Sequence, residues 1–196
     1  MSRSVTMKRA RKSQGFTIVE TIVAVGIILV VAAIAAPQVT RAVRTYRLNG
    51  ATTDVANMIQ RGRYEAIRRN VNTRVRAIQG GGGGGQWQIW VDNDNDAAVD
   101  ANEPFIFLPP DMDFLDQGQV PAVQSMGYPN VQQPANNAIS FDPRGTVDFG
   151  PGGAPAVVVV FLGVPNDPGY GFRAIALTPS GKTRVWRASS QSSRWE

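Results

Sequence analysis

Cysteine and histidine are both absent from this sequence. Without a thiol or an imidazole, the chain cannot carry cysteine-nucleophile or Ser-His-Asp chemistry, a Cys/His zinc site or a disulfide. Carboxylates do gather in one acidic segment, but glycosidase-type chemistry also needs a cleft that no sequence pattern indicates. We therefore expect that this protein is not an enzyme and that it needs no organic cofactor.

Each part of the chain carries mainly one sign of charge, and the opposite sign is scarce there. The net charge of +5 comes from the first fifteen residues, and from Phe16 onward 15 basic residues balance 15 acidic ones. Residues 41–76 hold nine arginines against two acids, and residues 92–167 hold eleven acids against one arginine. Residues 173–196 are basic again. This segregation favours docking to protein partners over bulk nucleic-acid binding.

One long hydrophobic run is present, and it contains a carboxylate. Phe16 to Ala36 would span about 31 Å as a helix, which matches the core of a bilayer. The basic residues before it favour a cytoplasmic N-terminus. A charge at mid-depth costs about 2.5–3.5 kcal/mol, and Glu20 lies one turn from the start of the run, where the cost is smaller. Glu20 still calls for a partner.

Three interpretations of this segment compete. It could be a plain signal anchor that tolerates Glu20. It could be a secretory signal, because Ala33-Ile34-Ala35 follows the small-x-small pattern of a cleavage site, and a soluble head would then be released. The third interpretation rests on a resemblance: Gly15-Phe16-Thr17-Ile18-Val19-Glu20 is similar to the type III signal of type IV pilins and type II secretion pseudopilins.

That resemblance implies how the N-terminus is processed. A prepilin peptidase would cut between Gly15 and Phe16, remove a leader of residues 1–15 and methylate the new amine. Glu20 then falls at the fifth mature position, and Pro37 falls at the family's helix-kink position. We hypothesise that Glu20 of one subunit pairs with the Phe16 amine of its neighbour, so that the carboxylate is neutralised only on assembly.

Beyond the transmembrane segment, residues 37–70 are predicted to continue the helix with one apolar face. The residues of that face would be Val39, Val43, Tyr46, Gly50, Val55, Ile59, Gly62 and Ala66. Residues 71–196 then form a β-rich head. The predicted strands are 71–77, 87–91, 105–108, 139–141, 146–149, 156–161, 172–178 and 183–187. The glycine run 80–85 is predicted to be a hairpin loop, and residues 109–137 a long surface excursion.

The strand order and the stretch WQIWVDNDNDAAVDANEPFI resemble the FimT/GspH family of minor pseudopilins. The resemblance implies an α+β fold that is type IV pilin-like, with a long N-terminal helix, membrane-embedded in its first half, packed on an antiparallel β-sheet head. It also implies a single-pass protein of the bacterial inner membrane with a periplasmic head. Its partners would be the prepilin peptidase and other pilins or pseudopilins in a filament.

Residues 92–103 match much of an EF-hand loop. Asp92, Asp94, Asp96, Asp100 and Glu103 fall at loop positions 1, 3, 5, 9 and 12, and hard oxygen ligands at alternate positions suit Ca²⁺. Ala97 stands where the motif needs glycine, and strands rather than helices flank the loop. The alternative is an acidic turn whose Asp and Asn side chains bond their own backbone.

The C-terminal stretch PSGKTRVWR contains Gly-Lys-Thr, but Ala176 stands where a Walker A loop needs glycine, and a strand follows. A tight hairpin turn with solvated cations is the simpler interpretation. Some FimT-like minor pilins bind DNA through a Gly-Arg-x-Arg motif, which Gly181-Lys182-Thr183-Arg184 resembles. Lys182 lacks the bidentate fork of arginine but can contact a phosphate. Further DNA contacts could come from Arg187, Arg194 and the Trp195 ring.

Together these patterns predict a minor pseudopilin or minor pilin that is assembled into a type II secretion pseudopilus or a type IV pilus tip complex. The alternative is a DNA-binding minor pilin that serves natural transformation.

Overall fold

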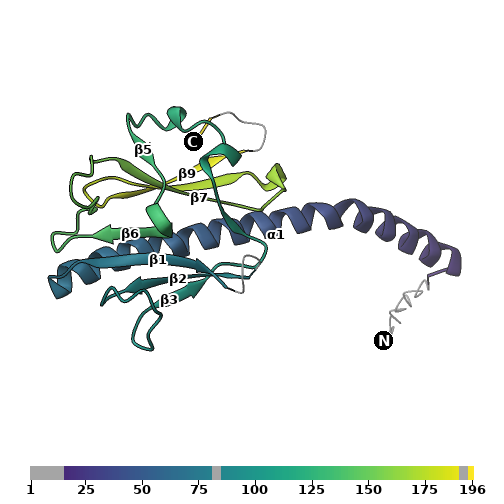
Figure 1. Ribbon diagram of the computed structural model, residues 1–196. Coiled ribbons are helices and arrows are strands. Elements are labelled where there is room, and N and C mark those ends of the chain that lie inside the picture. Colours follow the sequence, from purple (N-terminus) through teal and green to yellow (C-terminus); the bar gives the residue numbers. More distant parts are fainter. Residues whose placement is uncertain (1–15, 81–84, 190–193) are drawn as a thin grey trace, which may run out of the picture. The chain divides into compact units, whose positions relative to one another are not determined.

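The computed structural model describes residues 16–80, 85–189 and 194–196. The chain divides into two compact units, one that ends at Arg41 and one that begins at Ala42. A single helix, α1 (Ile18–Arg69), contributes to both units and contains Pro37. All the strands belong to the second unit, which is the head (Figure 1).

The C-terminal part of α1 presents an apolar face to the head. The predicted positions Val55, Ile59, Gly62 and Ala66 are buried. The predicted positions Val39, Val43, Tyr46 and Gly50 are exposed, so that part of the prediction is wrong. The face instead begins with Leu48, Ala51 and Thr52. Gly50 precedes Ala51 by one residue, which turns it about 100° around the helix and away from the core.

The first sheet of the head is antiparallel, in the order β3-β2-β1-β6. Its strands are β1 (Thr73–Gln79), β2 (Trp87–Asp92), β3 (Phe105–Phe107) and β6 (Ala138–Phe141). Adjacent antiparallel pairing of β1 and β2 confirms the predicted hairpin across the glycine run, although residues 81–84 lie outside the described residues.

The second sheet has the order β4-β7-β8-β9, with β5 added beside β7. Its strands are β4 (Asp113–Leu115), β5 (Val131–Gln132), β7 (Val157–Gly163), β8 (Phe172–Leu177) and β9 (Thr183–Ala188). β5 pairs with β7 in parallel, whereas the other pairs are antiparallel. Every residue of β7 and β8 is buried, and both strands are apolar except for Arg173 in β8.

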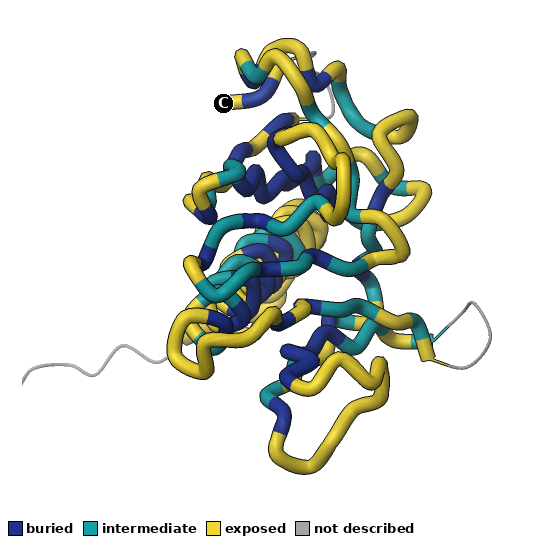
Figure 2. The backbone as a smooth tube through the Cα atoms, turned by 60° about the vertical axis from the view of Figure 1, so that its left-hand side comes forward, coloured by how far each residue is buried: buried dark blue, intermediate teal, exposed yellow. Residues whose placement is uncertain are grey.

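Two apolar clusters hold the head together. Figure 2 shows which parts of the backbone are buried. The first joins α1 to the inner faces of both sheets and includes Leu48, Ile59 and Phe141. The second lies on the other face of the second sheet and includes Leu115, Val123, Met126 and Trp195. The segment 109–137, predicted to be a surface excursion, therefore contributes buried side chains to a core, and it contains β4, β5 and three short 3-10 helices: Gln117–Gln119, Val123–Met126 and Ala135–Asn137.

Candidate functional site

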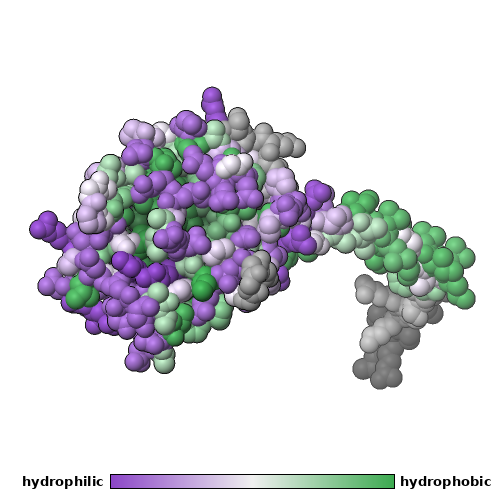
Figure 3. Space-filling model, in the orientation of Figure 1, coloured by the Kyte–Doolittle hydropathy of each residue, from purple (hydrophilic) through white to green (hydrophobic). Residues whose placement is uncertain are grey.

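The N-terminal part of α1 is exposed along its whole length. Phe16 and all residues from Thr17 to Ala36 are exposed, and Figure 3 shows the apolar side chains that gather there. Among the described residues, α1 is the one helix that is long and apolar enough to cross a membrane, by length and composition. Apolar side chains on this scale must be covered by lipid or by another protein.

Glu20 lies in the first turn of this apolar helix. The Thr17 hydroxyl accepts a hydrogen bond from the Glu20 backbone N–H at 3.2 Å, so Thr17 caps the helix. A threonine with a glutamate three residues later is a capping-box signature. The carboxylate of Glu20 itself forms no hydrogen bond or ion pair with a described residue. Thr17 was not predicted to be a functional residue, although the T-x-x-E spacing could have identified it.

The other predicted processing and assembly positions are only partly visible. Gly15 and the leader 1–15 lie outside the described residues, so the cleavage site stays a prediction. Pro37 lies within α1, and the helix continues past it. Its missing N–H leaves the residue 33 carbonyl without its usual helical donor. Three residues on, the Thr40 hydroxyl donates to the Ala36 carbonyl at 3.1 Å.

The acidic loop between β2 and β3 brings together three of its five predicted ligands. Carboxylate oxygens of Asp92, Asp94 and Asp96 all lie within 4.8 Å of one another. Glu103 is buried, but its two oxygens accept hydrogen bonds from the backbone N–H groups of Asn93, at 2.6 Å, and Asp100, at 3.3 Å. Glu103 therefore closes the loop, and neither it nor Asp100 joins the cluster.

The predicted DNA-binding residues lie on a hairpin between β8 and β9. Gly181 has φ +81°, and the Lys182 carbonyl accepts a hydrogen bond from the Thr178 N–H at 2.9 Å. The hairpin rests on α1, because the Gln60 side chain donates to the Gly181 carbonyl at 3.1 Å and to the Thr183 hydroxyl at 3.3 Å. A strand follows Lys182, as predicted, so the stretch is not a phosphate-binding loop.

The two arginines of β9 that were predicted to bind DNA lie on opposite faces of the second sheet. Strand residues alternate between the faces of a sheet, which puts Arg184 on the side of Trp186 and Arg187 on the opposite side. The Arg184 guanidinium lies 3.9 Å from the centre of the Trp186 ring. Arg187 is paired across the sheet with Arg173.

Trp195 cannot stack on a base, contrary to the prediction. Its ring is buried, packs on Phe161 with the ring centres 5.7 Å apart, and donates from Nε1 to the Pro121 carbonyl at 3.0 Å. Within the predicted DNA-binding stretch, Lys182, Arg184 and Arg187 are exposed.

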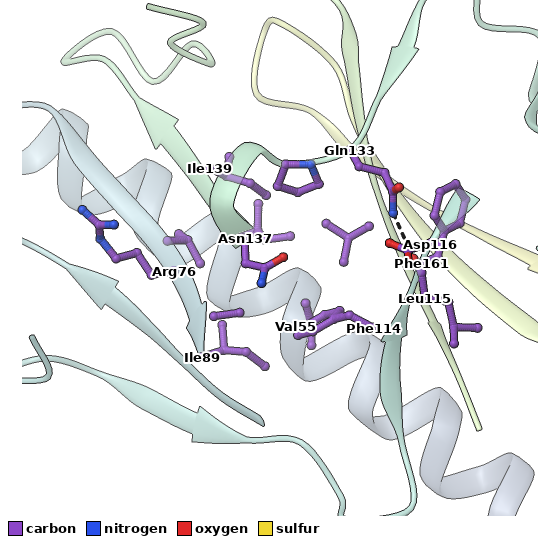
Figure 4. A pocket seen from close by; sticks show the side chains of 15 residues that line it. Val55, Arg76, Ile89, Phe114, Leu115, Asp116, Gln133, Asn137, Ile139 and Phe161 are labelled. Carbon is purple, nitrogen blue, oxygen red and sulfur yellow. Dashed lines mark hydrogen bonds between the residues drawn. The ribbon is translucent and has the colours of Figure 1, made fainter. Parts of the chain in front are cut away.

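A cavity of about 160 Å³ lies between the two sheets above α1 (Figure 4). Val55 of α1, Ile89 and Ile139 of the first sheet, and Phe114 and Phe161 of the second line it. The Gln133 amide beside it donates to the Leu115 carbonyl at 2.9 Å. Arg76 and Asp116 are the charged residues of a lining that is otherwise mostly apolar, and Arg76 is bonded to Asp92.

Two protein-family models match this chain and agree with the resemblance stated from its residues. The model of the prokaryotic N-terminal methylation motif matches residues 10–36. The solved structures include a similar chain, the crystal structure of the type IV minor pilin FimU from Pseudomonas aeruginosa strain PAO1. That chain is 16% identical, and the match covers 74% of this chain and 90% of that one with a TM-score of 0.45. No curated protein sequence matches significantly.

The model of the Type II transport protein GspH family matches residues 51–181, about two thirds of the chain. The match begins in α1 and ends in the hairpin before β9, so it covers most of the head. It confirms the predicted pilin-like α+β fold and the predicted kinship with the pseudopilins. The chain belongs to the GspH family of type II transport proteins.

Proposed function

We propose that this pilin-like chain is a minor pseudopilin or minor pilin subunit that is cut between Gly15 and Phe16 and joins a filament through α1. The filament would belong to a type II secretion system or a type IV pilus machine. The observation that carries the proposal is the exposed apolar helix with one unpartnered carboxylate in its first turn, directly after a methylation-motif leader. A soluble secreted head would have no use for that carboxylate.

Before assembly, the inner membrane would hold the subunit. The basic residues of the leader favour a cytoplasmic N-terminus, which puts the head on the periplasmic side. Lipid would then cover the exposed apolar side chains between Phe16 and Ala36. Neighbouring pilin-like subunits would replace that lipid within a filament.

Cleavage would turn the first turn of α1 into an electrostatic docking element. It removes the basic leader and creates a positive amine on Phe16, one turn before Glu20. Removing two charges from water is costly unless they pair, and a lone carboxylate in lipid has no partner. Pairing of Glu20 with the amine of an adjoining subunit would therefore stabilise one axial register between subunits over the others.

The test combines the mature N-terminus with one charge substitution. Mass spectrometry of wild-type protein is expected to show N-methylated Phe16 as the first residue. Glu20→Gln should be cleaved normally, because the backbone N–H that Thr17 caps is unchanged, but it should be absent from isolated filaments or cross-linked subunit complexes. Thr17→Val is the matched control: it costs the helix about 1 kcal/mol of capping but keeps the carboxylate, so it should assemble.

Two results would contradict the proposal. An uncut N-terminus, or one that begins near Ala36, would restore the signal-anchor or secretory interpretation. Normal incorporation of Glu20→Gln would leave the subunit assignment in place but reject the pairing.

DNA binding is a second candidate, favoured by one arrangement of the head. The hairpin with Lys182 lies against Arg63, whose Nε donates to the Gly145 carbonyl at 2.9 Å. Lys182 thus sits near a second cation at that end of the head. A gel-shift titration tests this function: Lys182→Ala with Arg184→Ala should weaken binding, and binding should fall steeply with salt. Binding that the double variant leaves intact would reject the hairpin as the DNA site.

A further inference from the structure

The acidic loop 92–103 is built around a buried carboxylate with an unused oxygen. Asp92 is 0% exposed, at the end of β2. Its Oδ2 accepts hydrogen bonds from Arg76 Nε and from the Ala97 N–H, the latter at 3.3 Å, whereas Oδ1 is buried without a hydrogen-bond partner. A buried charged oxygen without a partner is costly and rare in native proteins, so it needs an explanation.

Two further carboxylates lie close to that of Asp92. Asp94 and Asp96 each place an oxygen within 4.8 Å of the others and of Asp92. Both residues are exposed, and neither forms an ion pair with a described residue. As the acidic-turn interpretation predicts, Asp94 Oδ1 accepts a hydrogen bond from the Asp96 N–H at 3.4 Å and Asp96 Oδ1 accepts one from the Ala98 N–H at 2.7 Å, which leaves the second oxygen of each carboxylate for a ligand. Three carboxylates this close repel one another unless a cation sits among them.

One backbone angle of the loop matches the EF-hand pattern. Ala97 has φ +67°, at the position where the EF-hand motif places an invariant glycine for its sharp turn. Ala97 therefore adopts the left-handed conformation that the motif normally assigns to glycine. Glu103 closes the loop through two backbone amides, so the convergence of the three aspartates does not depend on a metal to fold the loop.

We propose that this loop binds one Ca²⁺ ion through Asp92, Asp94 and Asp96. The unused Oδ1 of Asp92 would supply the buried ligand, and the two exposed carboxylates would close over the ion. Backbone carbonyl groups and water would complete the oxygen shell that Ca²⁺ prefers. Arg76 holds the other oxygen of Asp92 and brings a positive charge close to the ion, which weakens binding.

The expected affinity is therefore modest. Glu103 is occupied by the backbone and does not supply the bidentate ligand of an EF-hand, so a Kd of about 0.1–1 mM is expected, as in extracellular calcium modules. Mg²⁺ should bind worse, because it demands a tighter octahedral shell and gives up water reluctantly. Binding would fasten the end of β2 to the loop that leads into edge strand β3.

Terbium luminescence of the full chain in detergent, after treatment with a chelator, tests the site. Trp90 lies two residues from Asp92 and can sensitise a bound Tb³⁺ ion. We expect a saturable signal that Ca²⁺ removes at about 1 mM and that Mg²⁺ at the same concentration does not. Ca²⁺ should also raise the Tm of the chain. Asp94→Asn and Asp96→Asn should each weaken binding about tenfold, because ligand charge sets affinity in such loops.

The control is Asp54→Asn, which removes an exposed acid from α1 and should leave Tb³⁺ and Ca²⁺ binding unchanged. Both loop variants change exposed side chains, so they should fold. The proposal is overturned by a missing saturable signal, by a signal that Asp94→Asn and Asp96→Asn do not weaken, or by equal displacement with Mg²⁺. This test does not depend on leader cleavage or filament assembly.

Discussion

Gly62 permits the close approach of α1 to β1. It is buried, and a Cβ built at this position would collide with Cγ2 of Val75. Gly62→Ala must therefore push the helix away from the sheet or force Val75 out of its rotamer. We expect a loss of about 1–3 kcal/mol in the free energy of unfolding, the usual cost of overpacking a core. Denaturant unfolding followed by tryptophan fluorescence would measure this loss.

Gly50 provides the matched control on the same helix. It is exposed, and a Cβ built there meets no atom within 4 Å. Gly50→Ala should therefore stabilise the head by about 0.5–1 kcal/mol, because alanine is the better helix former. Equal effects of the two substitutions would show that helix propensity, and not the fit against Val75, decides the outcome.

The residues of the acidic loop show how far sequence spacing can predict a site. Alternate spacing predicts that Asp92, Asp94 and Asp96 converge, and they do. The same motif predicts Glu103 as a ligand, but the backbone N–H groups of Asn93 and Asp100 occupy its oxygens. Backbone donors compete for every carboxylate in a short loop, and that competition depends on the turn geometry, which spacing does not specify.

At the scale of elements, most strands follow their alternating or continuous apolar patterns. The segment 146–149 does not become a strand: it forms a single bridge between Val147 and Phe141. The reason is local. Asp142 accepts hydrogen bonds from the backbone N–H groups of Arg144 and Thr146, at 3.0 and 2.8 Å, and this tight turn is followed by another at Gly150, which has φ +73°. The two turns bend the backbone away on both sides of Val147, and ladder pairing is limited to its bridge with Phe141.

The layer over the second sheet was harder to predict than the strands. Leu115, Val123 and Met126 are buried, but they lie in two different short elements, β4 and the 3-10 helix Val123–Met126, so the spacing between them does not report one continuous helix or strand. Proline and glutamine dominate the surrounding sequence and read as a surface loop. Its packing is decided by a distant partner, Trp195, whose backbone N–H donates to the Ser125 hydroxyl at 3.1 Å. Such long-range contacts leave no local signal in the sequence.

Arg173 connects the second sheet to α1 without a carboxylate partner among the described residues. Its Nε donates to the Asn49 side-chain oxygen at 2.8 Å, and its Nη1 donates to the Phe172 carbonyl at 2.9 Å. Burial first, and repulsion from Arg187 second, lower the pKa of Arg173. Asn49→Ala should cost about 1.5–3 kcal/mol of unfolding free energy, because a buried charged donor loses its acceptor.

Asn49→Asp should keep an acceptor for Arg173 and should therefore lose less unfolding free energy than Asn49→Ala. A carboxylate beside the buried guanidinium should make this variant more stable than Asn49→Ala at neutral pH. The new Asp would have a lowered pKa, so its contribution is present at neutral pH and disappears as the pH falls below about 4. Urea unfolding across pH 3–7 measures this, with Thr53→Asp as the control for an added charge on the exposed side of α1. Equal stability of the two Asn49 variants at pH 7 would reject the electrostatic argument.

At the scale of the whole molecule, the residues proposed for anchoring and assembly differ from those that form the core of the head. Residues 16–36 are all exposed, and neither apolar cluster of the head contains a described residue before Leu48. The helical residues in the core of the head therefore all come from the part of α1 that belongs to the second unit. The first part of the helix can therefore serve the proposed anchoring and assembly without changing the stability of the head.

This separation predicts that residues 42–196 fold on their own. That fragment keeps both apolar clusters and the contact in which Arg44 Nη1 donates to the Tyr170 hydroxyl at 3.0 Å. Its denaturation midpoint should match that of the full chain in detergent. A fragment that begins at residue 56 loses Leu48 and Val55, each worth about 1.5–3 kcal/mol when fully buried, together with Asn49, the acceptor for Arg173. Because whole domains are stable by only about 5–15 kcal/mol, this shorter fragment should unfold or aggregate. Near-ultraviolet circular dichroism and urea unfolding of both fragments would decide the matter. If the longer fragment also fails to fold, the head must need the first half of α1, and the two tasks are not separate.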